Sequence, residues 1–543
     1  MRIVPVLDAS QAARLIPDAA VISVSSSSGL GCPDAVLAAI GERYAAESAP
    51  RDLTTLHPIA AGDMYGIKGI DHLCRPGQLR RVFAGSLPSG SSKLDPPLIR
   101  QLIHGEQIEA HNIPSGVLFQ MHRAASTGQP GVFTEVGLGT YADPRLDGAK
   151  MNSRTPDFVE LREVNGKEYL FYPAITVDVA IIRATTADEL GNLSYEHEGG
   201  SLGALDQAYA AHNSGGIVIA QVKRLSDAQL DAPDVHVPGI LVDAIVVAPD
   251  QLQTTQTAYD PALSGQQRRS LDDVEPVEFG MEKVIARRAA AELTLDATVN
   301  LGFGVSAAVP RILLEEGHAE DVTWIIEQGA VGGFPLTGFA FGCALNPQAL
   351  MQSIDQFTQL QGGGFDAAML SFLEVSQHGD VNVSHLPSRP HVTAGVGGFA
   401  DIVTRAPKIV FSGFFTAGRK DIRIADGALV IVQDGPVAKF VPAVAQVTFS
   451  GKMARRRGQH VLYVTERCVL ELGDDGLTVI EIAPGVDLER DVLGRAEIPL
   501  RVSDQLKLMD PALFRPEPTG LVLPSRPARI SRFTARPTAP LAS

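Results

Sequence analysis

The sequence is poor in cysteine, with four in 543 residues, and none of the four belongs to a C-x-x-C pair. Scattered cysteines of this kind predict reduced residues of the core, not a disulfide framework or a zinc site. The histidines also lack the spacing of metal ligands, so we assign no metal. The four cysteines are Cys32, Cys74, Cys343 and Cys468.

Positive charge is also scarce. The chain has 46 Lys and Arg against 62 Asp and Glu, which gives a formal net charge of −16. An acidic balance disfavours wide, non-specific binding to nucleic acids and favours a soluble protein of the cytoplasm. A hydrophobic content of 45% is ordinary for a globular enzyme.

The sequence lacks the two kinds of long apolar run that direct a chain to a membrane. Residues 1–5 (MRIVP) do not begin the apolar core of a signal peptide. Residues 328–354 carry no formal charge, but Pro335, Asn346, Pro347 and several glycines argue against a spanning helix. We therefore expect neither secretion nor membrane insertion.

Apolar, β-branched runs alternate with helical stretches, which predicts parallel α/β layers. A strand at 20–24 leads through a small-residue loop at 25–31 into a helix from residue 33. Further strands are predicted at 82–84, 216–222 and 239–247, with helices at 97–104 and 204–212. A second series starts with a helix at 282–293, a strand at 296–301 and a helix at 306–316.

A chain of this length is too long for one core. Residues 251–279 turn polar, are broken by Pro and Gly, and become acidic, which is typical of a linker. We predict an N-terminal α/β domain at 1–250, this linker, and a C-terminal α/β domain at 280–512. The Pro- and Arg-rich tail at 513–543 is expected to be poorly ordered.

One carboxylate stands out against this background. The apolar run 322–326 predicts a buried strand that ends at Glu327, and a turn with three glycines and a charge-free segment follow at once. An acid in such a dry setting can be a base, a ligand or a covalent nucleophile. The other interpretation is a solvated strand end or a helix cap.

Residues 302–307 (GFGVSA) match a dinucleotide-binding fingerprint between a strand and a helix. In this interpretation Glu327 would be the acid that binds the ribose, and the protein could be a nicotinamide-dependent dehydrogenase. Later in the chain, Gly397 and Gly398 could present backbone amides to an oxyanion, although an isolated Gly-Gly is also typical of a hairpin turn.

Other polar stretches read as loops between strands. Residues 112–116, 136–145 and 183–194 are suited to lining a cleft, or are ordinary turns. The basic cluster of Lys452 and residues 455–457 could neutralise the phosphates of a nucleotide, but is better interpreted as the exposed tip of a hairpin.

Taken in order, five motifs resemble the family I coenzyme A transferases, and most of all the fused, single-chain acetate or propionate CoA-transferases. The resemblance runs from about residue 17 to about residue 518. Its specific parts are 186–194 (TADELGNLS), 300–304 (NLGFG), 327–333 (EQGAVGG), 379–384 (GDVNVS) and 397–402 (GGFADI).

The resemblance implies two similar open α/β domains with the active site between them and Glu327 as nucleophile. Glu327 would pass through an acyl anhydride and a glutamyl-CoA thioester in a ping-pong cycle. Acyl-CoA and a carboxylic acid such as acetate would be the substrates, with no permanently bound cofactor. A homo-oligomer is the habit of the family. Four glycines are assigned to binding coenzyme A: Gly302, Gly304, Gly329 and Gly395.

One departure concerns the oxyanion donors. The family has glutamine in a Pro-Gln-Gly turn, where this chain has Pro114-Ser115-Gly116. The shorter hydroxyl of Ser115, or a water that it holds, would then be the second donor beside Gly397 or Gly398. A thioesterase on the same scaffold and a non-catalytic acyl-CoA-binding protein remain as alternatives.

Overall fold

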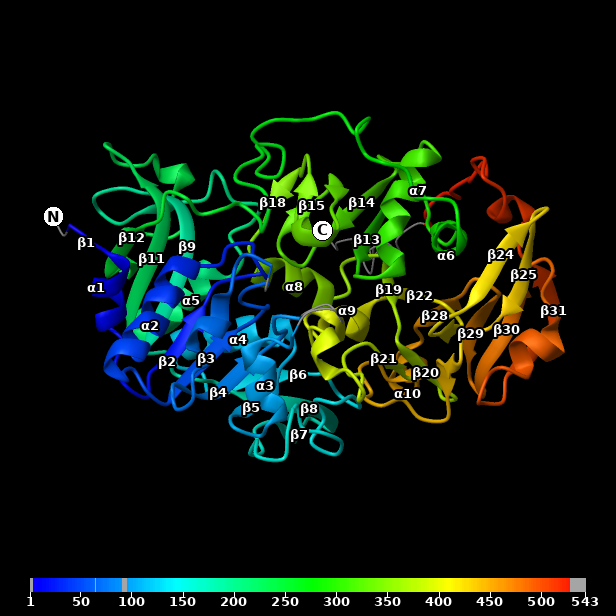
Figure 1. Cartoon of the computed structure of the whole chain (residues 1–543), viewed down its shortest axis with the longest axis horizontal. Coiled ribbons are helices and arrows are strands. Elements are labelled where there is room, and N and C mark those ends of the chain that lie inside the picture. Colours follow the sequence, from blue (N-terminus) through cyan, green and yellow to red (C-terminus); the bar gives the residue numbers. More distant parts are fainter. Residues whose placement is uncertain (1–2, 64, 90–94, 528–543) are drawn as a thin grey trace, which may run out of the picture.

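Two large β-sheets organise the protein. The computed structural model describes residues 3–63, 65–89 and 95–527. The first sheet draws its strands from residues 6–247 and the second from residues 297–508. They lie toward opposite ends of the molecule, with α4, α8 and α9 between them (Figure 1). The predicted α/β fold with two similar halves is confirmed in outline.

The first sheet is parallel except for its short strand β10. Its central strand β9 is buried along its whole length, which explains its continuous apolar and small residues. The strands in spatial order are β1 (Val6–Leu7), β12 (Ala244–Val247), β11 (Ile217–Leu225), β9 (Val179–Ala187), β2 (Val21–Val24), β3 (Leu53–His57), β4 (Leu79–Ala84) and β5 (Glu109–Asn112), with β10 (Leu193–Ser194) beside β9.

Helices cover both faces of this sheet, because successive side chains of a strand point to opposite faces. Val179 and Ile181 pack with α1 (Ala9–Arg14), α2 (Asp34–Glu47) and α3 (Leu98–His104). Ala180 and Ile182 belong to the cluster with α4 (Ser115–Ser126) and α5 (Ala204–Asn213). An antiparallel sheet of β6 (Gly131–Thr134), β8 (Lys167–Pro173) and β7 (Glu160–Val164) adjoins α4.

The second sheet has a parallel centre with antiparallel pairs added on both sides. Helices α6 (Met281–Ala290) and α7 (Val309–Glu315) cover one of its faces. The strands in spatial order are β18 (Ala349–Leu350), β15 (Ala330–Val331), β14 (Val322–Ile325), β13 (Ala297–Leu301), β19 (Ala367–Ser371), β22 (Lys408–Ser412), β28 (His460–Val464), β29 (Cys468–Gly473), β30 (Gly476–Ile482) and β31 (Arg501–Leu508).

Short strands complete the second half around this sheet. They pair as β16 (Phe334–Pro335) with β17 (Ala344–Leu345), β20 (Glu374–Ser376) with β21 (Val381–Asn382) and β27 (Phe440–Val441), β23 (Thr416–Ala417) with β26 (Val437–Ala438), and β24 (Asp421–Ala425) with β25 (Ala428–Gln433).

Both sheets reverse their strand order beside their first central strand. The chain goes from β2 to β3 on one side and returns to β9 on the other, and it goes from β13 to β14 and returns to β19. In open α/β sheets, ligands bind in the crevice at the carboxyl ends of the strands at such a reversal. The loop at 25–31, the turn at 302–304 and Glu327 follow three of these strands.

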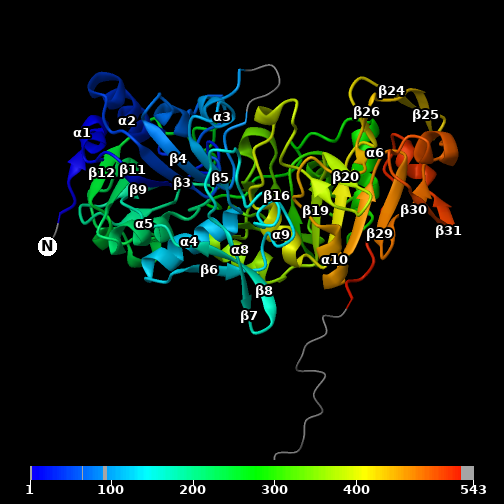
Figure 2. The ribbon, with the colours of Figure 1, turned by 90° about the horizontal axis from the view of Figure 1, so that it is seen from below.

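The two halves share one apolar core. Helix α4 of the first half packs on α8 (Ser353–Gln361) and α9 (Phe399–Arg405) of the second, and the rings of Phe119 and Phe357 lie 5.8 Å apart between their centroids. A single cluster of buried side chains continues from Ile182 of β9 through these helices to Phe411 of β22. Figure 2 shows α4, α8 and α9 next to one another from below. Relative motion of the halves would therefore disrupt a packed core.

A buried ion pair ties β9 to the segments that surround it. Arg183 donates to the Glu198 carboxylate at 2.6 Å, and both side chains are almost wholly buried. The same guanidinium donates to the carbonyl oxygens of Cys32 and Gln253. Arg183 thus joins the strand, the start of α2 and residue 253 of the predicted linker.

Four expectations need correction. Residues 183–187 belong to the buried strand β9 and are not a loop. Residues 455–457 lie in helix α10 (Gly451–Arg457), not at a hairpin tip, because Ser450 caps its first turn and Gly458 ends it in the left-handed conformation. The predicted strand 239–247 begins as a 3-10 turn and becomes β12 only at Ala244.

The fourth correction concerns the tail. Residues 513–527 are held against the second half: the Arg287 guanidinium donates to the carbonyl oxygens of Leu513, Arg515, Pro516 and Glu517, and Leu523 is buried. Residues 528–543 lie outside the described residues. All four cysteines are free and buried, as predicted. Within the described ranges, no helix has the length and apolar character to cross a bilayer.

Candidate active site

Glu327 lies just beyond the carboxyl end of β14. Asn300 on the neighbouring strand donates to the Ile325 carbonyl at 3.0 Å, which fixes the end of β14. The chain then turns sharply, because the amide of Ile326 donates to Ala330 and the amide of Gly329 donates back to Ile326. The strand end and this turn hold the Glu327 backbone at the edge of the sheet.

The Glu327 carboxylate is half-buried and has no ion pair with any residue in the described ranges. Its Oε1 accepts a hydrogen bond from Gln328 Nε2 at 3.3 Å. Its Oε2 lies against Gly398, where a Cβ would come within 2.0 Å of it. Burial raises the pKa of Glu327 to about 7, and the bond from Gln328 lowers it only in part. The solvated strand-end interpretation does not fit this environment.

The turn at 395–398 connects the second half to the first. The amide of Gly397 donates to the Gly85 carbonyl at 2.7 Å, and the Gly397 carbonyl accepts from the Ser115 amide at 2.9 Å. Val396 donates to Asn112 Oδ1 at 3.0 Å, and Gly395 pairs with Ser86 in an isolated bridge. The Gly397 amide is thus occupied, whereas the Gly398 amide has no hydrogen bond within the described part of the chain. Of the two predicted donors, the geometry favours Gly398.

Ser115 lies close to this turn but does not face the carboxylate as a donor. Its side chain is fully buried at the first residue of α4, and its hydroxyl donates to the Pro58 carbonyl at 2.6 Å. A direct role as oxyanion donor would require this bond to break. Ser115 thus contacts the 395–398 turn through its amide while its hydroxyl is engaged elsewhere, and its role as oxyanion donor stays a prediction.

Three of the glycines predicted to bind coenzyme A have structural reasons of their own. Gly302 and Gly304 lie against Leu370 and Ser371 of β19, where a Cβ would come within 2.7 Å of each. Gly329 has a φ of +123°, and a Cβ there would lie 2.0 Å from the Met351 carbonyl oxygen. Their role toward coenzyme A stays a prediction.

Sequence reasoning missed two side chains of the site. Asp401 on α9 is fully buried and accepts hydrogen bonds from the Gly116 amide at 3.0 Å and from Gln361 Nε2 at 2.7 Å. Burial raises its pKa to about 7, and the charge of Glu327 contributes. The other is Gln328. A lone acid among the apolar residues of α9 was a signal for Asp401, but nothing in the sequence shows that Gln328 turns back to Glu327.

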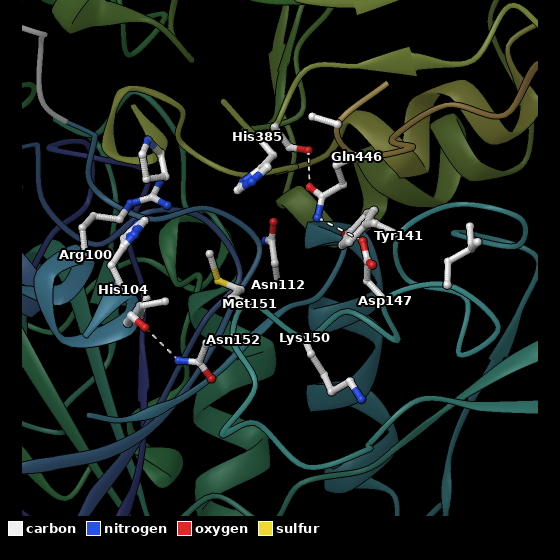
Figure 3. A pocket seen from close by; sticks show the side chains of 15 residues that line it. Arg100, His104, Asn112, Tyr141, Asp147, Lys150, Met151, Asn152, His385 and Gln446 are labelled. Atoms are coloured by element: carbon white, nitrogen blue, oxygen red, sulfur yellow. Dashed lines mark hydrogen bonds between the residues drawn. The ribbon is translucent and has the colours of Figure 1, made fainter. Parts of the chain in front are cut away.

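A cavity of about 440 Å³ opens between the halves (Figure 3). Asn112, which accepts a hydrogen bond from the 395–398 turn, lines this cavity. Glu327 does not line it. Gln446 of the second half crosses its rim, accepting from Ser384 and donating to Asp147 of the first half. The buried Tyr141 hydroxyl has no hydrogen-bond partner within the described residues. The same residues contain no group of three or more metal-ligating side chains.

Comparison with known proteins decides the family. A family model described as "Coenzyme A transferase" matches residues 6–248. Acetate CoA-transferase YdiF of Escherichia coli O157:H7 is 41% identical over 528 residues, covering 96% of this chain and 97% of the relative. The chain belongs to the coenzyme A transferase family. Caffeate CoA-transferase of Acetobacterium woodii is 40% identical, covering 95% and 98%.

Solved structures agree with this membership. The crystal structure of the YdiF apoenzyme superposes with a TM-score of 0.89 at 39% identity, covering 96% of this transferase and 98% of that chain. A YdiF thioester complex with CoA gives a TM-score of 0.88. The family and fold class expected from the motifs are confirmed, and the protein is an enzyme that transfers coenzyme A. The nicotinamide dehydrogenase alternative is not supported.

Proposed function

We propose that Glu327 is the covalent nucleophile and that the enzyme moves coenzyme A from a short-chain acyl-CoA to a carboxylic acid such as acetate. One observation carries the assignment: the Glu327 carboxylate is half-buried at the carboxyl edge of β14, without an ion pair among the described residues, and directly against Gly398. The acetate and caffeate transferases among its relatives support a carboxylic acid as acceptor.

The environment of the carboxylate suits attack on a thioester. A carboxylate with a raised pKa is a stronger nucleophile than a solvated one once it has lost its proton. Oε2 would add to the acyl carbonyl carbon, and the Gly398 amide, which has no hydrogen bond among the described residues, would donate to the new oxyanion. One such donor is worth about 3 kcal/mol in the transition state. The C–S bond then breaks and gives free CoA thiolate and an acyl-glutamyl anhydride.

The thiolate would attack the Glu327 carbonyl carbon, release the acyl group as a carboxylate and leave a glutamyl-CoA thioester. An acceptor carboxylate would run the same steps backwards. Donor and acceptor thus use one site in turn, which is ping-pong catalysis. Binding of the distant parts of coenzyme A could be used to lower these barriers.

Four further features belong to the proposal. We place the N-terminal domain at 1–250, the linker at 251–279, the C-terminal domain at 280–512 and the tail at 513–543. Gly302, Gly304, Gly329 and Gly395 remain the proposed coenzyme A contacts. The enzyme is proposed to act as a homo-oligomer in the cytoplasm, with no bound cofactor.

The test is to trap the thioester. The protein is incubated with acetyl-CoA, reduced with borohydride and mapped by mass spectrometry, and we expect the modification at Glu327. Glu327→Ala should lose transferase activity by on the order of a thousandfold or more. Glu320→Ala is the control, because Glu320 is an exposed acid of the same segment.

A label on another residue, or full activity of Glu327→Ala, would overturn the assignment. Hydrolysis of acetyl-CoA that is indifferent to an acceptor acid would identify a thioesterase. Binding of acetyl-CoA without exchange into labelled acetate would identify a non-catalytic binding protein.

A further inference from the structure

The side chain that follows the nucleophile has an unusual environment. Gln328 is only 1% exposed, and its Nε2 lies between two acceptors, Glu327 Oε1 at 3.3 Å and Ser27 Oγ at 3.2 Å. Its Oε1 is buried and has no hydrogen-bond partner within the described residues. An unsatisfied buried acceptor destabilises the folded state, so this amide is held in place at the expense of stability.

Gln328 fits into its position because two neighbouring residues are glycines, without side chains. Gly342 has a φ of +101°, and a Cβ there would lie 2.9 Å from Gln328 Cδ. Gly200, in the first half, approaches the Gln328 carbonyl oxygen so closely that a Cβ would lie 2.9 Å from it. Residues of both halves therefore confine Gln328.

The orientation of the amide follows from the chemistry of its neighbour. An ionised carboxylate can only accept hydrogen bonds, so the NH₂ group must face Glu327 and the amide oxygen must point away. This explains why the oxygen is the atom left without a partner. The carboxylate thus has different neighbours at its two oxygens, Gln328 at Oε1 and Gly398 at Oε2.

We propose that Gln328 is a catalytic residue whose Nε2 donates to Glu327 Oε1 when negative charge develops there, a role that rests on the proposed function. When CoA thiolate adds to Glu327 Cδ, a C–S bond forms and the electron pair of the Cδ=Oε1 bond moves onto Oε1. Collapse restores that double bond, breaks the Cδ–Oε2 bond and releases the acyl carboxylate with Oε2. An acceptor carboxylate that adds to the thioester puts charge on Oε1 again.

The two donors would therefore act at different carbon atoms. Gly398 lies beside the oxygen that attacks the acyl group, whereas Gln328 holds the oxygen that remains on the enzyme. An alkoxide concentrates charge that a carboxylate shares between two oxygens, so the bond from Gln328 strengthens in the tetrahedral species, as catalysis requires. With the Ser115 hydroxyl committed to Pro58, Gln328 supplies the side-chain amide of the site.

Gln328→Leu tests this, because it removes the donor at similar volume. In single-turnover mixing with acetyl-CoA, we expect the variant to form the trapped Glu327 thioester about 10²- to 10³-fold more slowly than the native enzyme. Discharge of the thioester by acetate should slow by a similar factor, while KM for acetyl-CoA changes little. Loss of the donor should also move the acid limb of the kcat/KM profile to higher pH.

Gln78→Leu is the matched control. Gln78 is also fully buried with an unpaired Oε1, but it packs against α2, away from the site. It should match Gln328→Leu in any loss of stability and retain native kinetics. Gln328→Glu keeps the shape but replaces the donor by an acceptor. It should be slow at pH 8, and its rate relative to the native enzyme at the same pH should rise at lower pH, where the new carboxyl is protonated and can donate.

The outcomes separate the two hypotheses. If the native protein forms no adduct on Glu327, the proposed function fails and this role fails with it. If the native protein forms the adduct and Gln328→Leu forms it within about threefold of the native rate, only the role of Gln328 is wrong. An effect confined to KM, or one shared by Gln78→Leu, also contradicts it. If Gln328→Leu does not fold, Gln328→Glu decides, and native rates at pH 8 overturn the role.

Discussion

At the scale of single residues, the site depends on how an acid behaves when it is partly removed from water. Glu327 and Asp401 both have a pKa raised to about 7, chiefly because burial disfavours their charged forms. Asp401 is compensated by two donors, whereas Glu327 has one long hydrogen bond. The Glu327 carboxylate therefore accepts fewer hydrogen bonds than that of Asp401, which leaves its lone pairs available for attack.

The first prediction is a pH dependence. Only ionised Glu327 can attack, and its raised pKa means that the ionised fraction grows as pH increases through about 7. We expect kcat/KM to rise about tenfold per pH unit below pH 6 and to level off above pH 8. Initial rates between pH 5.5 and 8.5, with acetyl-CoA well below KM, measure this. A profile that is flat over this range contradicts it.

The second prediction compares two neighbouring glycines. A Cβ at residue 398 would lie 2.0 Å from Glu327 Oε2, whereas a Cβ at residue 397 would meet open space. Gly398→Ala should therefore displace the carboxylate and lower kcat by at least about a hundredfold. Gly397→Ala should cost only the backbone strain of an alanine at a φ of +59°, about 1 kcal/mol of folding free energy. Similar kinetics for the two variants would show that the contact is unimportant.

At the scale of elements, much was predictable from local pattern and the rest was not. Glu327 at the end of a strand followed from the apolar run 322–326 and the glycines after it. Helix α10 was predictable too, since Ser450 and Gly458 are ordinary cap residues, but its three arginines were interpreted as a hairpin tip. The bonds of Asp401 to Gly116 and of Ser115 to Pro58 join residues far apart in the chain, and no local pattern encodes them.

The third prediction concerns the buried pair that joins β9 to its surroundings. Glu198→Ala leaves the Arg183 guanidinium buried without its counter-charge, which should cost about 3–5 kcal/mol. Asp157→Ala breaks the exposed pair with Lys150 and should leave the free energy of unfolding almost unchanged, because water screens the pair. Denaturant unfolding of both variants and the native protein measures the difference. Equal losses would contradict the contrast.

At the scale of the whole molecule, the two halves behave as one body because their core is continuous from β9 to β22. The fourth prediction is that a cut in the exposed stretch 266–270 leaves the protein assembled and active. A protease site inserted there, followed by cleavage and gel filtration, tests this. We expect both fragments to co-elute at native activity. Separation of the fragments in buffer would show that the shared core is too weak to hold them.

The unlike surroundings of the two Glu327 oxygens have a consequence for the fate of individual atoms. If the carboxylate does not rotate between cycles, Oε1 stays with the protein while the position of Oε2 is emptied and refilled from each incoming acid. An isotope carried in by the acceptor would then accumulate in one oxygen of the side chain and never in the other. One oxygen of Glu327 would then come from the most recent acceptor acid, and the hydrogen bond from Gln328 would keep the two oxygens distinct.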